Sequence, residues 1–316
     1  MKKYLITGGA GFIGSNTTER IIQNGDHVTI IDNLTTGFIE NLQPFLDNHP
    51  NQIKFINGTI EDLDLLQKEF KGIDYVIHLA AYTSVQRSVE NPLDANKINI
   101  DALLNVLIAA RDNKVKRVVF ASTAAVYGNS PKQPKDENIT PEPLSPYAVG
   151  KITGEYYMKI FYQLYGLETV CLRYFNIFGT RQNPNSPYSL ALPKFIKTMI
   201  QGESPVIFGD GKQARDFTYV ANLVQANLLA CESKRAVGES INIACGKLTT
   251  VLEMVEAINK ALGTDIKPTF TPPRAGEVRM SYADISKAKN LLGYKPEVEF
   301  EDGIKKAVEW HKERIS

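Results

Sequence analysis

The hydrophobic residues of the first 176 positions fall into short runs that alternate with longer helical patterns. Continuous rather than alternating apolar character is typical of strands that are covered on both faces. The helical patterns are clearest at 98–112 and 145–165. We therefore predict an α/β fold built on a doubly wound parallel sheet. Six apolar runs rich in β-branched residues predict its strands at 3–7, 27–32, 53–58, 74–81, 116–122 and 169–175.

The pattern loosens after about residue 176. Residues 180–189 are rich in Pro, Asn and Ser, which favour a loop. This change predicts two domains: a Rossmann-type domain at 1–176 and a smaller mixed α/β domain at 177–316, with about 217–246 returning to the large domain. The elements expected after the loop are a helix near 190–201, a strand near 206–209, a helix near 220–232, a loop over 271–280 and two terminal helices.

Composition excludes several classes of function. The chain has 316 residues, with 36 Lys and Arg against 35 Asp and Glu, so its net charge is +1. Without a basic excess we expect neither nucleic acid nor a membrane surface as a partner. No apolar run approaches the roughly 18 residues of a membrane span. The apolar stretch behind Met1-Lys2-Lys3 is too short for a signal peptide.

The cysteines and histidines form no metal-ligand pattern. The cysteines are odd in number and widely spaced, as expected of reduced thiols in a cytoplasmic protein: Cys171, Cys231 and Cys245. The four histidines show no ligand spacing either. We therefore expect a cytoplasmic protein without a metal site.

A glycine-rich loop directly follows the first predicted strand. TGGAGFIGS (7–15) has the spacing G-x-x-G-x-x-G at Gly8, Gly11 and Gly14. Glycine permits a tight turn and a close approach of backbone to a pyrophosphate, which the N-terminus of the following helix attracts. Asp32 ends the next strand, where an acidic side chain accepts hydrogen bonds from ribose hydroxyls and repels a 2′-phosphate. The loop and Asp32 predict nucleotide binding, with NAD favoured over NADP.

A second group of residues combines the end of the fifth predicted strand with the helix that follows. Ser145-Pro146 is typical of a helix start, so Tyr147 and Lys151 lie one turn apart on one face. An ammonium near a phenol lowers its pKa from about 10 toward neutrality, which makes Tyr147 a candidate acid–base group. Thr123 ends a strand at the ligand-binding edge, where its hydroxyl can hold the same substrate oxygen. The Tyr-x-x-x-Lys spacing alone is weak, because it occurs by chance on many helices.

These motifs together resemble the extended short-chain dehydrogenase/reductases over essentially the whole chain. The resemblance rests on the glycine loop, Asp32, Ser122-Thr123, the Tyr147/Lys151 pair and RYFNIFG (173–179). Within that superfamily the chain most resembles the UDP-hexose 4-epimerases, in particular those that act on N-acetylated sugars such as UDP-N-acetylglucosamine.

The resemblance implies a mechanism for these residues. Tyr147 takes the proton of the sugar C4 hydroxyl while C4 gives a hydride to NAD, and Thr123 holds that oxygen. Lys151 tunes Tyr147 and contacts the nicotinamide ribose. The 4-keto sugar turns over and takes the hydride back on its other face. Related dehydratases and decarboxylases carry an acidic residue just after the Thr, whereas Ala124 and Ala125 transfer no proton, which favours epimerisation.

The resemblance also assigns cofactor contacts along the edge of the predicted sheet. Three positions depart from the family pattern: Thr59 replaces an acidic residue that contacts the adenine, and Ala102 and Leu103 replace a Gly-Thr pair. These departures concern the adenine contacts rather than the chemistry. Besides the glycines, the expected contacts are Phe12, Ile13, Asp32, Asn33, Thr36, Gly37, Thr59, Ile60, Leu79, Ala80, Ala81, Asn99, Ser122, Tyr147, Lys151 and Tyr174.

The UDP-sugar site is assigned by the same resemblance. Asn176, Arg215 and Arg274 match residues that contact the substrate pyrophosphate, and a guanidinium suits a diphosphate because it bonds bidentately. Ser281 stands where glucose-restricted bacterial epimerases carry a bulky Tyr. It therefore leaves room for a C2 N-acetyl group.

The identity of the sugar stays open at the sequence level. Ser84 matches a position near the sugar in the N-acetyl-sugar epimerases, and Ala124 and the catalytic Thr123 are also expected to contact it. Thr83 and Ala124, however, replace residues that are often Gly and Ser in those enzymes.

Three hypotheses are therefore kept. The first is a UDP-N-acetylhexosamine 4-epimerase. The second is an epimerase of UDP-glucose and UDP-galactose, or of a uronic or otherwise substituted UDP-sugar. The third is a non-catalytic NAD- or nucleotide-sugar-binding protein, which the intact catalytic residues argue against. The resemblance also implies a homodimer formed through the helices at 98–112 and 145–165.

Overall fold

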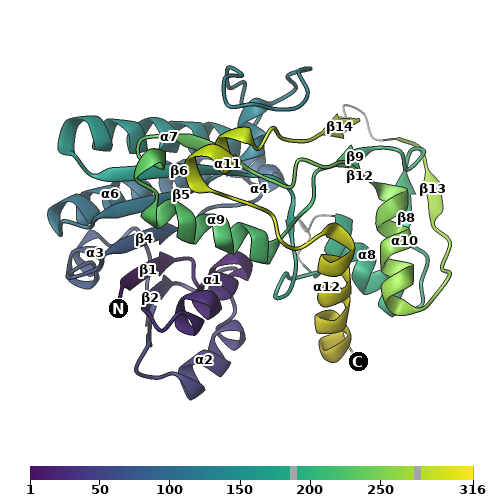
Figure 1. Cartoon of the computed structure of the whole chain (residues 1–316), viewed down its shortest axis with the longest axis horizontal. Coiled ribbons are helices and arrows are strands. Elements are labelled where there is room, and N and C mark those ends of the chain that lie inside the picture. Colours follow the sequence, from purple (N-terminus) through teal and green to yellow (C-terminus); the bar gives the residue numbers. More distant parts are fainter. Residues whose placement is uncertain (186–190, 274–278, 316) are drawn as a thin grey trace.

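The computed structural model describes residues 1–185, 191–273 and 279–315. Its centre is a sheet of seven strands in the order β11-β6-β5-β4-β1-β2-β3, in which every neighbouring pair is parallel (Figure 1). The predicted fold class and the six predicted strands are confirmed, and β11 is a further strand that the sequence pattern did not predict. The strands are β1 (Lys3–Thr7), β2 (His27–Asp32), β3 (Ile53–Asn57), β4 (Tyr75–His78), β5 (Arg117–Thr123), β6 (Glu168–Tyr174) and β11 (Ser240–Ile243).

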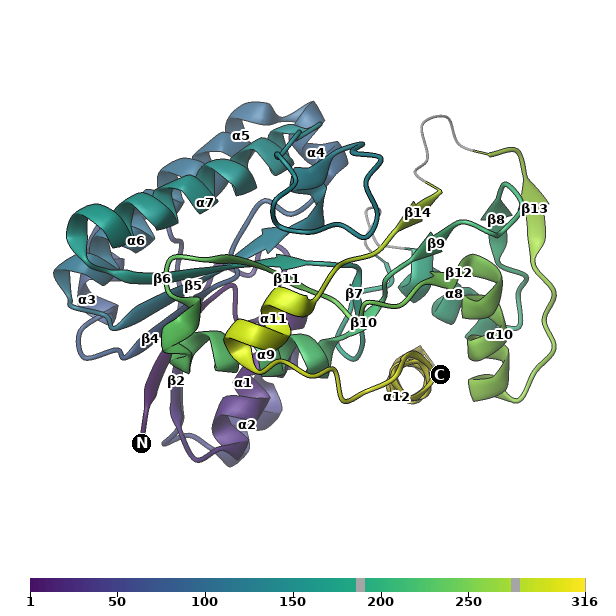
Figure 2. The same ribbon diagram turned by 45° about the horizontal axis from the view of Figure 1, so that its top comes forward.

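Alternate residues of the strands supply two apolar cores, one on each face of the sheet. In β1, Tyr4 and Ile6 belong to one core and Leu5 to the other. Figure 2 shows the two layers of helices on opposite faces of the sheet. Because both faces are covered, most positions of the central strands are apolar and buried. One layer holds α1 (Phe12–Gln23), η1 (Ile39–Asn41), α2 (Gln43–Asn48) and α9 (Val220–Glu232); the other holds α3 (Leu63–Glu69), α4 (Val85–Glu90), α5 (Pro92–Asn96), α6 (Ala102–Asp112) and α7 (Pro146–Tyr165).

Helix α7 begins where the sequence indicated. The Ser145 hydroxyl accepts a hydrogen bond from the N–H of Ala148 at 3.2 Å, and Pro146 is the first helical residue. Gly154 lies where α7 passes over β5, and a Cβ there would stand 2.6 Å from Cζ of Phe120. Glycine therefore allows the helix to approach the strand closely. The predicted helix at 98–112 is divided into the π-helical η2 (Lys97–Asp101) and α6.

The remaining residues form a smaller region that begins directly after β6. Its strands form three small sheets, and the division into two domains at residue 176 stays a prediction. The paired strands are β7 (Ile177–Phe178) with β10 (Thr218–Tyr219), β8 (Val206–Phe208) with β13 (Thr269–Thr271), and β9 (Ala214–Arg215) with both β12 (Thr249–Thr250) and β14 (Met280–Ser281). Its helices (Figure 1) are α8 (Ala191–Ile200), α10 (Val251–Leu262) and α12 (Phe300–Ile315), while α11 (Ser286–Leu292) and η4 (Lys234–Ala236) lie beside β11 and α9.

Asp216 joins the two regions. Its buried carboxylate accepts hydrogen bonds from the N–H groups of Cys245, Gly246 and Ala283 at 2.9, 2.8 and 3.3 Å. Burial raises the pKa of Asp216 to about 6, although these bonds act in the opposite direction. The carboxylate therefore ties the chain that follows β11 to the chain that follows β14.

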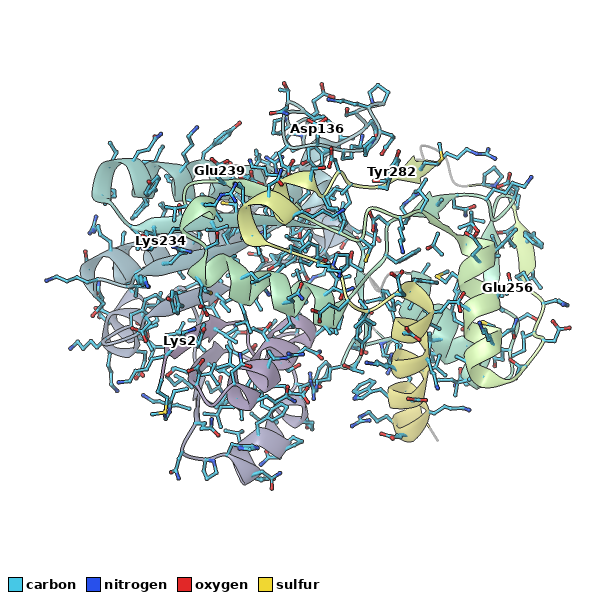
Figure 3. The ribbon with its side chains drawn as sticks, in the orientation of Figure 1. Lys2, Asp136, Lys234, Glu239, Glu256 and Tyr282 are labelled. Atoms are coloured by element: carbon cyan, nitrogen blue, oxygen red, sulfur yellow. The ribbon has the colours of Figure 1, made fainter. Side chains whose placement is uncertain are left out.

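The loop between η3 (Ala124–Tyr127) and α7 also reaches the smaller region. The Lys135 N–H donates to the carbonyl of Tyr282, and the N–H of Asp284 donates to the carbonyl of Lys135, both at 2.8 Å. The Gln133 amide donates to the carbonyl of Met280 at 3.0 Å. Figure 3 labels Asp136 in this loop and Tyr282 in the facing segment. The segment that carries Ser281 is thus held against the large sheet.

Neither a membrane-spanning helix nor a metal-binding cluster is found among the residues that the structure describes. None of the helices there is both long and apolar enough to cross a membrane. Across the same residues, no three or more His, Cys, Asp or Glu side chains gather in a way that could hold a metal ion.

Candidate active site

The predicted site residues gather at one edge of the large sheet. Because all seven strands are parallel, their carboxyl ends meet at this edge. The glycine loop follows β1, Asp32 ends β2, Thr123 ends β5 and Tyr174 ends β6. The remaining positions lie in the segments that follow the strands: Asn33, Thr36 and Gly37 after β2, Thr59 and Ile60 after β3, and Leu79, Ala80 and Ala81 after β4.

The glycine loop packs too closely against neighbouring backbone for side chains at Gly8 and Gly14. Gly8 has a φ of +75°, and a Cβ there would lie 2.7 Å from the backbone N of Ala80. A Cβ on Gly14 would lie 2.4 Å from the carbonyl oxygen of Gly8. Gly11 caps α1 without a side-chain hydrogen bond, and Phe12 and Ile13 open the helix. The loop therefore presents backbone and a helix N-terminus, the combination that binds a pyrophosphate.

Asp32 is fixed at the end of β2. Its two carboxylate oxygens accept hydrogen bonds from the N–H groups of Ala10, in the glycine loop, at 2.9 Å and of Leu34 at 2.8 Å. Burial raises the pKa of this carboxyl group, whereas the two bonds act in the opposite direction. The carboxylate lies next to Gly37, where a Cβ would stand 3.0 Å from Oδ2. Backbone bonds therefore hold Asp32 beside the glycine loop.

Several of the predicted cofactor and substrate residues form hydrogen bonds with neighbouring backbone or side chains. The buried Asn99 amide accepts from the N–H of Tyr82 at 2.8 Å and donates to its carbonyl at 3.2 Å, so it shapes the loop after β4. Ser84 caps α4 by accepting from the N–H of Arg87 at 3.1 Å. The Tyr174 hydroxyl donates to Asn227 at 2.8 Å. The hydroxyl of Thr59 donates to Glu61 at 3.0 Å.

The three predicted catalytic residues converge between α7 and β5. A hydrogen bond joins Tyr147 to Thr123 and acts to lower the pKa of Tyr147, although burial outweighs this effect. The ammonium group of the buried Lys151 donates to the carbonyl of Ala121 at 2.8 Å, and its Nζ lies 5.9 Å from the centre of the Tyr147 ring. The helix thus places the phenol and the amine beside the end of the strand, as predicted from their spacing.

The predicted charge state of this group needs a correction. The pKa of Tyr147 is raised, not lowered, because burial of the phenolate outweighs the bond from Thr123. Burial also lowers the pKa of Lys151 to about 7. The amine is therefore only partly protonated at neutral pH, and its effect on the phenol is weaker than the sequence spacing suggested. Sequence spacing shows which groups are neighbours but not how much water surrounds them.

The structure adds residues that the sequence reasoning assigned no role. Ser122, which is predicted to contact the cofactor, donates through its hydroxyl to the carboxylate of Glu155 at 2.5 Å. Glu155 in turn forms a buried ion pair with Arg173 at 2.7 Å. Glu155 follows Lys151 by four residues on the same face of α7, and that spacing was the available signal.

Three of the predicted substrate residues lie in or directly before the smaller region: Asn176 after β6, Arg215 in β9 and Ser281 in β14. Ser281 pairs with Arg215 in the β14–β9 register, and Ser281 is half-buried. The Arg215 guanidinium donates to the carbonyl of Ala214 at 2.9 Å. Asn176 follows β6 with a φ of +36°, and its amide donates to the carbonyl of Asp216 at 3.0 Å. Arg274 lies outside the described residues, so its predicted contact with the pyrophosphate stays a prediction.

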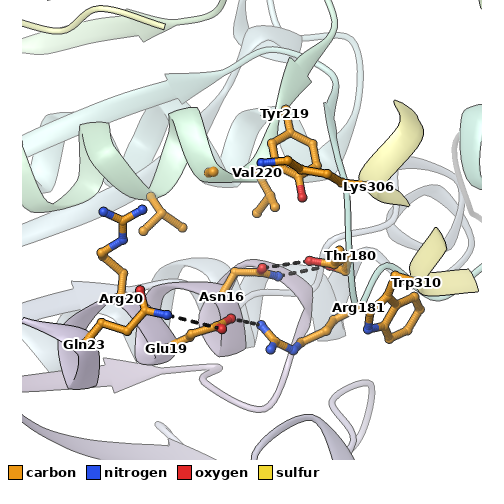
Figure 4. A pocket seen from close by; sticks show the side chains of 12 residues that line it. Asn16, Glu19, Arg20, Gln23, Thr180, Arg181, Tyr219, Val220, Lys306 and Trp310 are labelled. Atoms are coloured by element: carbon orange, nitrogen blue, oxygen red, sulfur yellow. Dashed lines mark hydrogen bonds and ion pairs between the residues drawn. The ribbon is translucent and has the colours of Figure 1, made fainter. Parts of the chain in front are cut away.

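A separate hollow of about 410 Å³ lies between α1, α9 and α12 (Figure 4). Its walls include the pairs Arg181–Glu19, at 2.7 Å, and Thr180–Asn16, at 3.0 Å. None of the residues that line it is one of the predicted site residues. We therefore place the candidate active site at the ends of the parallel strands rather than in this hollow.

Comparisons with known proteins cover almost the whole chain. The sequence pattern of the family described as GDP-mannose 4,6-dehydratase matches residues 5–307. A protein of Methanocaldococcus jannaschii, described as a putative UDP-glucose 4-epimerase, is 43% identical over 310 residues, which cover 98% of each chain.

Solved structures share the fold closely. The UDP-N-acetylglucosamine 4-epimerase of Methanobrevibacter ruminantium M1, in complex with UDP-N-acetylmuramic acid, is 44% identical, with a TM-score of 0.92 and 99% of both chains covered. The UDP-glucuronic acid 4-epimerase of Bacillus cereus, in complex with UDP-glucuronic acid and NAD, is 33% identical, with a TM-score of 0.89 and coverage of 98% of this chain and 99% of that one.

Burial of Lys151 makes the stability of the ligand-free protein depend on pH. Its pKa of about 7 in the folded protein lies below the 10.5 of an unfolded chain, so the unfolded state binds the extra proton between these values. The free energy of unfolding should therefore gain from this group as pH rises above 7, by at most about 1.4 kcal/mol per pH unit. We expect Lys151→Met to remove this gain and to be more stable than wild type at pH 6.

The measurement is urea unfolding of ligand-free protein at several pH values from 6 to 9.5. Lys159→Met, on the exposed side of the same helix, is the control and should keep the wild-type slope. Identical slopes for wild type and Lys151→Met would show that Lys151 does not titrate in this range.

Proposed function

This chain belongs to the UDP-sugar 4-epimerases, within the GDP-mannose 4,6-dehydratase family and the extended short-chain dehydrogenase/reductases, and we propose that it interconverts UDP-N-acetylglucosamine and UDP-N-acetylgalactosamine. It is an NAD-dependent isomerase that acts at C4 of a UDP-sugar. The observation that carries the choice of sugar is the small side chain of Ser281 beside Arg215.

The residues at the ends of β1 and β2 fit NAD. The close backbone turn at Gly8 and Gly14 forms only because Cβ atoms are absent, since each would collide with backbone, and such a loop lets a pyrophosphate approach the N-terminus of α1. The carboxylate of Asp32 is suited to accept from ribose hydroxyls and would repel a 2′-phosphate. Bound NAD supplies the group that accepts a hydride from C4 of the sugar and returns it.

The residues between α7 and β5 provide the proton chemistry that we propose. Tyr147 takes the proton from the C4 oxygen and later returns it, while the Thr123 hydroxyl holds that oxygen. The raised pKa of Tyr147 keeps the phenol protonated in the ligand-free protein, so it becomes a base only when positive charge is held near it. Lys151 is placed to supply that charge in its protonated form, because its Nζ lies 5.9 Å from the centre of the Tyr147 ring.

The residues after Thr123 supply no further proton-transfer group, so the reaction is limited to oxidation of the sugar at C4 and return of the hydride. Ala124 and Ala125 open η3, and neither side chain can transfer a proton. The dehydration named in the family's description needs a proton donor or acceptor beyond C4, and the resemblance places that group at these positions. Epimerisation needs only one proton-transfer group and a hydride acceptor.

The proposed sugar rests on the space at Ser281. Its carbonyl accepts from the N–H of Asp216 at 3.0 Å, and the Gln133 amide bonds to the carbonyl of the preceding Met280. The backbone of β14 is thus held on two sides. The size of the side chain at 281 therefore decides how much room remains for the C2 group of the sugar. The relatives compared above are named for glucose, N-acetylglucosamine and glucuronic acid, so UDP-glucose is the second candidate.

We also propose that the enzyme is a homodimer. Exposed apolar side chains occupy one face of α7, at Val149, Tyr156, Ile160 and Leu164, with 41–70% of each exposed. Leu93 of the neighbouring α5 is 84% exposed. The described large apolar residues of α6 are buried or half-buried, so α7 and α5, rather than α6, supply the exposed apolar surface. A face of this kind is typical of a protein interface.

Replacing Tyr147 by Phe tests the proton-transfer role. Tyr147→Phe should lower kcat by at least about 100-fold, in the range that one general acid–base group contributes, and should retain bound NAD. The measurement is proton NMR of the anomeric region during incubation with UDP-N-acetylglucosamine. Tyr165→Phe, at the exposed end of the same helix, is the matched control. Turnover near the wild-type rate in Tyr147→Phe would contradict the assignment.

Replacing Ser281 by Tyr tests the choice of sugar. A bulky side chain should exclude the C2 N-acetyl group, so kcat/KM for UDP-N-acetylglucosamine relative to UDP-glucose should fall at least about 100-fold, since a site rejects groups by steric overlap. Ser281→Ala keeps the space and should keep the wild-type ratio. An unchanged ratio in Ser281→Tyr would mean that another residue limits the C2 group. Failure of wild type to convert the N-acetylated sugar would contradict the proposed substrate itself.

Introducing charged side chains on the exposed apolar face of α7 tests whether the protein forms a dimer through that face. Combining Ile160→Asp and Leu164→Asp should yield a monomer, because two carboxylates cannot be buried at low energetic cost in an apolar interface. Sedimentation velocity at micromolar concentration measures the mass. Leu248→Asp, at an exposed apolar residue elsewhere, should leave the dimer intact. A wild-type monomer would refute the proposal directly.

A further inference from the structure

Three successive turns of α7 are bound to three successive residues at the end of β5. Tyr147 is hydrogen-bonded to Thr123, and Lys151 donates to the carbonyl of Ala121 at 2.8 Å. One turn further along the helix, Glu155 accepts from the hydroxyl of Ser122 at 2.5 Å. The first two residues belong to the proposed chemistry, whereas Glu155 is too far along the helix to share their role.

This part of β5 has a sheet partner on only one side. The pairing of β5 with β4 ends at His78↔Phe120, whereas its pairing with β6 continues to Thr123↔Tyr174. Residues 121–123 therefore extend beyond β4, and side chains of α7 bond to each of them.

Glu155 is itself held rigidly. Its Oε1 accepts from Nε of Arg173 at 2.9 Å, and its Oε2 accepts from the Arg173 Nη2 at 2.7 Å and from the hydroxyl of Ser240 at 2.8 Å. Both members of the ion pair are buried, at 5% and 4% exposure. A bidentate pair fixes both the position and the orientation of the carboxylate.

The network continues from Arg173 into the segment after Thr123. The Arg173 Nη1 donates to the hydroxyl of Tyr127, in η3, at 2.9 Å, and that hydroxyl donates to Asn242 of β11 at 2.6 Å. Through these bonds, α7, β5, β6, β11 and η3 share one set of polar contacts beneath the catalytic residues.

Such a buried ion pair needs an explanation other than stability. Removing two charges from water costs several kcal/mol, and well-packed apolar residues often stabilise a core as well or better. The fixed geometry of the carboxylate is what an apolar pair would not supply.

We propose that Glu155 is a positioning residue for the epimerisation reaction: it holds the end of β5 at the distance from α7 that Thr123, Tyr147 and Lys151 require. Arg173 serves to hold Glu155. This inference rests on the proposed function of the same site. Small displacements of catalytic groups lower rates strongly, because reacting atoms must be aligned within a narrow range of distances.

The same two strands offer a matched control at their other end. Arg117 of β5 is paired with Glu168 of β6 through Nε at 3.0 Å and Nη2 at 2.6 Å. In the sheet register Arg117 faces Glu168, while Ser122 faces Arg173. Glu168→Gln thus weakens an Arg–carboxylate pair between β5 and β6 without touching the site.

The experiment compares Glu155→Gln with Glu168→Gln in the NAD-containing enzyme. We expect Glu155→Gln to lower kcat at least tenfold with KM and bound NAD within about threefold of wild type, and Glu168→Gln to leave kcat within twofold. Equal kcat in the two variants, with equal losses of melting temperature, would show that Glu155 is only structural and would overturn the proposal.

A second variant tests the proposal if Glu155→Gln does not fold. Ser122→Ala removes the bond to β5 but leaves the ion pair with Arg173 intact. It should lower kcat several-fold, and combining it with Glu155→Gln should add little, because both remove the same link. An unchanged kcat in Ser122→Ala would overturn the proposal whatever the fate of Glu155→Gln.

Hydrogen–deuterium exchange provides a readout that does not depend on activity. In Glu155→Gln and Ser122→Ala, amides in the peptide covering 121–128 should exchange faster, while those at 113–118 keep the wild-type rate. Faster local exchange with an inactive wild type would mean that the proposed function has failed and the positioning contact stands. Unchanged local exchange, or a uniform increase in all peptides, would overturn the positioning role.

Discussion

The close approach of α7 to β5 is the constraint on which the candidate site depends. At Gly154 a single Cβ would collide with the ring of Phe120, and at Gly150 it would stand 2.9 Å from Cβ of Asn99. Because neither glycine carries a Cβ, α7 lies near enough for its side chains to form hydrogen bonds with the end of β5. Tyr147, Lys151 and Glu155 therefore reach β5 directly.

Burial at this contact sets the chemistry as well as the geometry. Removing water raises the pKa of Tyr147, so the phenol is protonated without ligand, and lowers the pKa of Lys151 to about 7, so the amine is only partly protonated at neutral pH. Nearby, burial lowers the pKa of His78 to about 3, and its ring is hydrogen-bonded to Thr7 at 2.7 Å. The protonation of Lys151 can therefore shift when a bound dinucleotide and diphosphate introduce negative charge nearby.

The two regions of the chain meet around Asp216 and the loop that carries Lys135. The contact at Lys135 is made by backbone hydrogen bonds, whereas the other contact depends on the side-chain carboxylate of Asp216, which accepts from backbone N–H groups. This arrangement holds the backbone of β14, and in the proposed function the side chain at 281 then sets the room for the sugar. It is consistent with a family in which one scaffold serves enzymes named for several different sugars.

The sequence alone determined the parallel sheet, the glycine loop, the start of α7 and the residues that meet at the sheet edge. Those features are local: apolar runs, glycine spacing and the N-cap at Ser145 each act within a few residues. Tertiary structure decided the rest. The charge state of Tyr147 and Lys151 depends on how much water the fold removes, and the link from Glu155 to Ser122 and Arg173 joins residues that are 33 and 18 positions apart. The helical spacing places Glu155 on the same face as Lys151, but only the packing of α7 against the strands decides that its partners are Ser122 and Arg173.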